Sequence, residues 1–184
     1  VYYLVPAKWQ WLVLLAFSYI YYIAGGIRYV GFLLFSTFVT WLTALAIEKM
    51  ETAGKHKTAR KFVILGLVLN FGMLGLVKYT NFAIENLNAL FHMNLRGMQI
   101  LLPLGISFYT FQSSGYILDV YWKRCKAEHH PLKYALFVSF FPQILQGPIG
   151  RYSRLANQLY APHKFEGKNI ARGFERILWG FFKK

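Results

Sequence analysis

The chain has 184 residues, of which 56% are hydrophobic and only 15% charged, and 21 Lys and Arg residues stand against 7 Asp and Glu residues. This profile favours a multi-pass membrane protein over a soluble domain. Nucleic-acid binding is not expected, because the basic residues form short clusters between apolar runs, where membrane topology explains them. A single cysteine, Cys125, excludes an internal disulfide, and no Cys and His spacing typical of a structural zinc site occurs.

Four apolar segments approach the length of about 20 helical residues that crosses a hydrocarbon core. They are residues 9–27, 29–47, 62–79 and 100–120. The first begins with tryptophans and ends at a pair of glycines, and the third carries Asn70 among glycines that suit close helix packing. The fourth holds Pro103 and several polar residues, including Gln112, so we expect it to lie inside the bundle and not against lipid.

The charge between these segments predicts their orientation, because cytoplasmic loops of membrane proteins collect Lys and Arg. The connection 48–61 carries five Lys and Arg residues, whereas the turn 25–28 and the connection 80–99 carry one each. We therefore expect the connection 48–61 in the cytoplasm and the other two outside. The basic segment 121–133, which follows the fourth span, is then cytoplasmic as well.

The next segment, 134–149, mixes apolar residues with helix breakers, and both of its flanks are basic. Sixteen residues interrupted by Pro142 and by the Gly147-Pro148 pair are too few to cross a bilayer comfortably. We predict a re-entrant hairpin that enters and leaves on the cytoplasmic side. Irregular backbone at that depth must be buried in protein or line a wet cavity, because lipid cannot satisfy its polar groups. A proline-kinked ordinary span is the alternative.

Polar side chains in and after this hairpin have two possible roles each. Gln143 and Gln146 lie three residues apart and share a helix face, where they either satisfy the hairpin backbone or bond to neighbouring helices. Arg151 and Arg154 are either anchors to lipid headgroups or contacts to a ligand.

No catalytic or metal-binding pattern is recognisable. The adjacent His129 and His130 lack a carboxylate or cysteine partner at a suitable spacing. Serine-hydrolase, P-loop, HExxH and paired-carboxylate motifs are absent from the sequence.

The segment 170–182 has apolar residues along one helix face and basic residues elsewhere, which predicts an amphipathic helix in the cytoplasmic interface. The apolar face consists of Ile170, Phe174, Ile177, Leu178 and Phe181. The chain starts without a methionine and stops within this helical pattern. We therefore expect it to be an incomplete piece of a longer membrane protein.

Three ordered motifs resemble the membrane-bound O-acyltransferase (MBOAT) superfamily: LLPLGISFYTFQSSGYILDVYWKR, FVSFFPQILQGPIGRYSRLANQL and GFERILWGFFKK. Residues 8–42 also resemble the early spans of that family. The similarity is greatest to bacterial members that act on alginate, and members that act on teichoic acid are more distant. The resemblance implies an all-α, polytopic helical bundle in the bacterial cytoplasmic membrane.

The resemblance also implies transfer of an acyl group, commonly acetyl, to a hydroxyl of an extracytoplasmic polysaccharide or cell-wall polymer. The donor would be acetyl-CoA or another acyl thioester that approaches from the cytoplasm, and no bound cofactor is implied. The histidine regarded as catalytic in this family lies in a later segment, so no catalytic residue is assigned within this chain. An extracytoplasmic transferase is a further possible partner.

The expected contribution of this chain is one wall of a substrate passage. The lining residues would be Gln112, Gln143, Gln146 and Arg151, with Gly147 and Pro148 shaping the turn. Arg151 would meet a phosphate of the donor, since arginine pairs well with phosphate. Two other classes compete with an acyltransferase. A transporter or flippase predicts an internal repeat, which the sequence does not show. A non-catalytic scaffold that recruits a transferase fits the missing histidine.

Overall fold

The structure is a computed structural model, and it describes residues 2–91, 102–144, 147 and 150–183. Within these residues the chain forms helices and no strand, which confirms the predicted all-α class. The α-helices in chain order are α1 Gln10–Ala24, α2 Val30–Thr52, α3 His56–Phe91, α4 Ile106–Tyr121, α5 Pro131–Ser139, α6 Phe141–Ile144, α7 Tyr152–Tyr160 and α8 Gly167–Phe182. Short 3-10 turns occur at Tyr2–Leu4, Ala7–Trp9 and Ile27–Tyr29.

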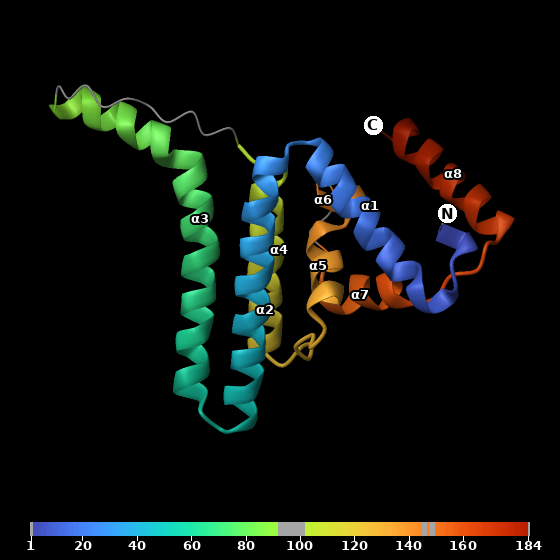
Figure 1. Ribbon diagram of the computed structural model, residues 1–184, viewed down its shortest axis with the longest axis horizontal. Coiled ribbons are helices and arrows are strands. Elements are labelled where there is room, and N and C mark those ends of the chain that lie inside the picture. Colours follow the sequence, from blue (N-terminus) through green and yellow to red (C-terminus); the bar gives the residue numbers. More distant parts are fainter. Residues whose placement is uncertain (1, 92–101, 145–146, 148–149, 184) are drawn as a thin grey trace.

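Helices α2, α3 and α4 pack against one another, and α3 lies at the edge of the bundle away from α1 and α5 (Figure 1). The segment Ile27–Thr52 has 26 residues and α3 has 36, and both are long and apolar enough to cross a membrane. These helices contain the predicted spans 29–47 and 62–79.

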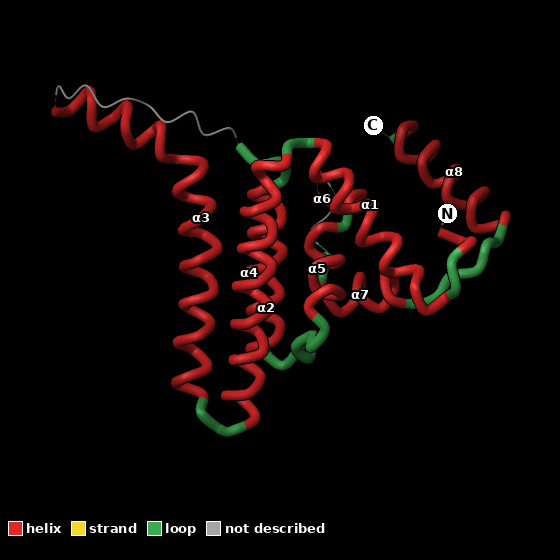
Figure 2. The backbone as a smooth tube through the Cα atoms, in the orientation of Figure 1, coloured by secondary structure: helices red, strands yellow, loops and turns green. Residues whose placement is uncertain are grey.

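The connection between α2 and α3 is much shorter than the predicted 48–61. Both helices continue into the charged flanks, because Lys and Glu are good helix formers once outside an apolar environment. Only residues 53–55 separate the helices, and Gly54 makes the turn with a φ of +71°. Figure 2 shows this connection as a short turn at one end of the bundle.

Helices α1 and α4 are shorter than the spans 9–27 and 100–120 that were predicted for them. Helix α1 has 15 residues and α4 has 16, which correspond to about 22 and 24 Å of helix. The predicted span 100–120 placed Pro103 inside a helix, but α4 begins only at Ile106. A residue that precedes proline disfavours the α conformation. Gly105, directly before α4, has a φ of +68° and is not helical either. Membrane crossing by either helix stays a prediction.

A buried polar network joins α2 to α3. The Asn70 side chain is only 1% exposed, and its amide donates hydrogen bonds to Thr40 Oγ1 at 3.0 Å and to the Gly66 carbonyl at 2.9 Å. The Ser36 hydroxyl donates to Asn70 Oδ1 at 2.6 Å. Within an apolar bundle, such cross-helix hydrogen bonds fix which faces of two helices meet.

The predicted amphipathic helix 170–182 lies within α8, and the structure buries none of the residues of α8. All five residues of its predicted apolar face are exposed, for example Phe174 at 63% and Phe181 at 75%. The position of α8 in a membrane interface stays a prediction.

Candidate functional site

The segment from α5 to α7 folds back on itself. Helices α5 and α6 run along α1 and α4, and α7 lies at the end of the bundle where α5 begins (Figure 1). Two hydrogen bonds join the flanks of this turn: the Tyr152 hydroxyl donates to Glu128 Oε2 at 2.7 Å, and the Tyr160 hydroxyl donates to the Lys133 carbonyl at 2.6 Å. The segment therefore has the shape of a hairpin and not of a proline-kinked continuous helix. Insertion of this hairpin into a membrane stays a prediction.

The first leg of the hairpin, formed by α5 and α6, packs antiparallel to α4. Near the base, the rings of Tyr116 and Tyr134 stack with centroids 4.7 Å apart. Farther along, the Gln112 amide donates to the Phe137 carbonyl at 3.1 Å. At the far end, Gly105 lies against the backbone of Ile144, the last residue of α6.

These contacts show how far the hairpin extends along α4 from its base. Eleven residues of chain separate Gly105 from Tyr116, which is about 16 Å of helix at about 1.5 Å per residue. That distance is roughly half of the ~30 Å hydrocarbon core. The hairpin is thus deep enough to reach the middle of a bilayer from one side.

Proline chemistry explains why the helix breaks where it does. Helix α5 ends at Ser139, and Phe140 leaves the helical conformation with a ψ of 108°. Pro142 lies in the first turn of α6, where its missing N–H requires no partner. The N–H of Phe141 donates instead to the Ser18 hydroxyl of α1 at 3.2 Å. The break is therefore tied to a second helix.

The residues predicted to line a passage differ in their surroundings. Gln112 is buried and bonded to α5, as described above. Gln143 is half-buried, and its Oε1 is buried without a hydrogen bond from the described part of the chain. Gly147 donates its N–H to the Gln143 carbonyl at 3.1 Å, and Arg151 is exposed directly before α7.

The structure therefore brings Gln143 and Gly147 together at the hairpin turn, with Gln112 on the neighbouring helix. Gly150, directly before Arg151, also lies against the Gln143 side chain. Gln146 and Pro148 lie outside the described residues. A shared passage lined by these side chains stays a prediction.

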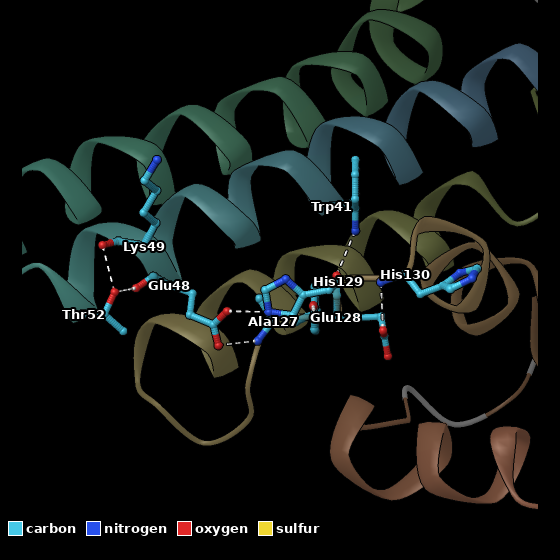
Figure 3. A network of polar contacts seen from close by, with 9 residues as sticks. Trp41, Glu48, Lys49, Thr52, Ala127, Glu128, His129 and His130 are labelled. Atoms are coloured by element: carbon cyan, nitrogen blue, oxygen red, sulfur yellow. Dashed lines mark hydrogen bonds and ion pairs between the residues drawn. The ribbon is translucent and has the colours of Figure 1, made fainter.

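Glu128 holds the base of the hairpin through four polar atoms. Its carbonyl accepts from Trp41 Nε1 at 2.8 Å, and its N–H donates to the Tyr116 hydroxyl at 2.8 Å. Its carboxylate accepts from the His130 N–H at 2.9 Å and from the Tyr152 hydroxyl described above. Figure 3 shows Trp41 and His130 converging on Glu128. One residue thus connects α2, α4, the start of α5 and α7.

A second acid fastens the same loop to the end of α2. Glu48 Oε1 accepts a hydrogen bond from the Ala127 N–H at 3.0 Å, and Glu48 Oε2 lies 3.3 Å from His129 Nε2 (Figure 3). One turn later, Glu51 Oε2 lies 3.2 Å from Lys123 Nζ. The loop from α4 to α5 is therefore held against α2 by carboxylates.

Sequence reasoning did not identify Glu128 or Glu48 as structural residues. The available signal was that Glu128 is an acidic residue within a basic segment, next to a long apolar run. Within the residues that the structure describes, no group of three or more His, Cys, Asp and Glu side chains could hold a metal ion. The polar atoms described here are suited to hold the fold together.

Comparison with known proteins gives clear relatives. The chain is 35% identical over its whole length to the probable alginate O-acetylase AlgI of Azotobacter vinelandii, and 37% identical to the protein of the same name in Pseudomonas aeruginosa. Over 95% of its length it is 32% identical to the peptidoglycan O-acetyltransferase of Helicobacter pylori. The chain spans 37%, 35% and 37% of the lengths of these three proteins. No family model and no solved structure matches it.

Proposed function

The chain is a homologue of these bacterial polymer O-acetylases, as its three motifs predicted, and we propose on that basis that it serves in a membrane O-acetyltransferase. The proposed reaction transfers an acetyl group to a hydroxyl of an extracytoplasmic polysaccharide or cell-wall polymer. One observation carries the proposal: the identity to the alginate O-acetylases runs through the whole chain, so it includes α4, the hairpin and α8.

We further propose that acetyl-CoA or another acyl thioester is the donor and that the hairpin helps to wall a passage for the acyl group. The reach of about 16 Å along α4 supports this role, since it would bring the hairpin turn near the middle of a bilayer. The buried Oε1 of Gln143 adds a hydrogen-bond acceptor at that turn. The chemistry requires a base for the attacking hydroxyl, and we assign none within this chain.

Deletion of the gene, followed by complementation, tests the proposed function. Exopolysaccharide and peptidoglycan are purified separately, and the ester-linked acetate that mild alkali releases from each is measured. We expect one polymer to lose its acetate on deletion and to regain it on complementation. Unchanged acetate in both polymers, together with lost transport of a solute, would establish a transporter instead.

Two measurements separate an enzyme from a scaffold and test the hairpin. Purified protein in liposomes, given labelled acetyl-CoA on one side and the deacetylated polymer on the other, should transfer the label to polymer hydroxyls and release CoA. A scaffold would require an added transferase. Gln143→Leu should lower polymer acetate without lowering protein abundance. Gln158→Leu is the matched control, because Gln158 is exposed on α7. Equal acetate from the two variants would limit Gln143 to a packing role.

We propose a multi-pass topology in the bacterial cytoplasmic membrane, with α7 in the cytoplasm. Cys125 is a poor reporter of this topology, because burial and the nearby carboxylates of Asp119 and Glu48 raise the pKa of its thiol to about 11. Ser153 is exposed on α7 and is a better site. In a Cys125→Ser background, Ser153→Cys should react with an impermeant maleimide only after the membrane is opened. Labelling of intact cells at this position would contradict the re-entrant hairpin.

A further inference from the structure

A groove of about 620 Å³ lies between α2 and α3, the two helices that are long and apolar enough to cross a membrane. Its volume falls within the range of about 300–1,000 Å³ that is typical of small-molecule sites. The lining is apolar except at one end, where Arg28 stands in the 3-10 turn before α2. The groove walls include Phe35, Val68 and Leu76, which are 46%, 60% and 70% exposed.

Two glycines keep the groove open. Gly31 lines it from α2 and Gly72 from α3, and a Cβ atom added at either position would meet no other atom within 4 Å. A larger side chain at either position would therefore project into free space. Side chains at these two positions would thus narrow the groove.

One cation, Arg28, marks one end of the groove. Arg28 is exposed and forms no ion pair with any carboxylate in the described part of the chain. The ion pairs of Glu48 and Glu51 lie at the far end of α2. Lys78 lies at a similar height on the antiparallel helix α3, but it does not line the groove, and its amino group lies 5.6 Å from the centre of the Tyr79 ring. Positive charge at one end of an apolar groove is complementary to an anionic lipid.

We propose that this groove binds one acyl chain of a phospholipid whose anionic headgroup lies beside Arg28. The site requires that α2 and α3 lie in a bilayer, but it does not depend on acyl transfer. The apolar walls of the groove are exposed, so a bound acyl chain can cover them. Without a bound chain, these walls would face mobile lipid chains. Arg28 favours a headgroup of net negative charge over a zwitterionic one, because the choline of the latter offsets the charge of its phosphate.

Retention of lipid by the purified protein tests the proposal. The protein is placed in nanodiscs made of equal parts phosphatidylglycerol and phosphatidylcholine, and lipids that stay bound on release are identified by native mass spectrometry. The wild-type protein should retain phosphatidylglycerol preferentially. Gly72→Leu should lower retention about tenfold, because its side chain would occupy the space of several methylene groups. Arg28→Gln should reduce the preference for phosphatidylglycerol about fivefold.

Gly75→Leu is the matched control. Gly75 lies on the same helix, also has free space for an added Cβ atom, and does not line the groove. Gly75→Leu should therefore retain lipid as the wild-type protein does. If Gly72→Leu does not fold, Gly31→Leu fills the groove from α2. Equal retention by the groove-filling and control variants, equal retention of both lipids by the wild-type protein, or no retained lipid would each overturn the proposal.

Discussion

Gly105→Ala is expected to lower the free energy of unfolding by about 3 kcal/mol, because two unfavourable effects fall on one residue. The first is conformational: Gly105 has a φ of +68°, and a residue with a side chain costs about 1–2 kcal/mol more in that region. The second is steric, since a Cβ atom at Gly105 would overlap the carbonyl oxygen of Ile144. A backbone oxygen cannot rotate away, so the hairpin would have to move along α4.

Gly115→Ala provides the matched control for this variant. Gly115 lies within α4, and an added Cβ would meet no atom within 4 Å. Alanine should stabilise the helix there by about 1 kcal/mol, because its helix propensity exceeds that of glycine. The two variants should therefore differ in the sign of their effect on the melting temperature, measured in detergent by intrinsic fluorescence. If Gly105→Ala has the same melting temperature as the wild-type protein, the backbone of Ile144 does not lie in close contact with Gly105.

Asn70→Ala is expected to destabilise the bundle by about 2 kcal/mol. The substitution removes the hydrogen bonds that Asn70 makes with Ser36 and Thr40 of α2, and it leaves both hydroxyls in a buried apolar setting. In membrane proteins, cross-helix hydrogen bonds contribute about 0.6 kcal/mol on average and up to about 1.7 kcal/mol. The loss of two such bonds accounts for the expected size.

Asn86→Ala is a close control on the same helix. The Asn86 amide donates to the Phe82 carbonyl at 2.7 Å, four residues earlier, just as Asn70 donates to Gly66 at 2.9 Å. Asn86 is exposed, so its replacement should change stability by less than about 0.5 kcal/mol. The difference between the two variants in chemical unfolding measures the cross-helix bonds together with the burial of Asn70. Equal effects would show that the network does not join α2 to α3.

Hydropathy located the long helices but not their ends. The run 62–79 lies within α3, and the run 29–47 lies within α2 except for Tyr29, which belongs to the 3-10 turn before it. The segment between the runs was expected to be a loop from 48 to 61. Hydropathy indicates where a helix would meet lipid, and it is blind to a helix that continues into water. Gly54 was the better signal for the turn, because a glycine supplies the positive φ that other residues avoid.

At the start of α4, hydropathy predicted a helix that begins too early. The run from Ile100 is continuously apolar, and this character concealed the proline and glycine at positions 103 and 105 that delay the helix until Ile106. Such residues are the strongest local markers of a break. A turn signal within an apolar run therefore carries more information about a helix boundary than the hydropathy of its neighbours.

The hairpin was predictable and its base was not. Basic flanks and breakers at Pro142 and Gly147 are local features of the sequence. The contacts of Glu128 join it to Tyr152, 24 residues away, and to Trp41, 87 residues away. Such pairings depend on how the helices meet in space, which no local pattern contains.

The position of Tyr152 in the chain has a consequence for the order of assembly during synthesis. Helices α2, α3 and α4 are complete once residue 121 has been added, so their mutual packing does not wait for the hairpin. The hydrogen bond from Tyr152 to Glu128 forms only after the whole hairpin has been translated. During the interval, α5 must find the surface of α4 without this connection at its base. The base of the hairpin is thus fixed later than the packing of α2, α3 and α4, which act as its scaffold.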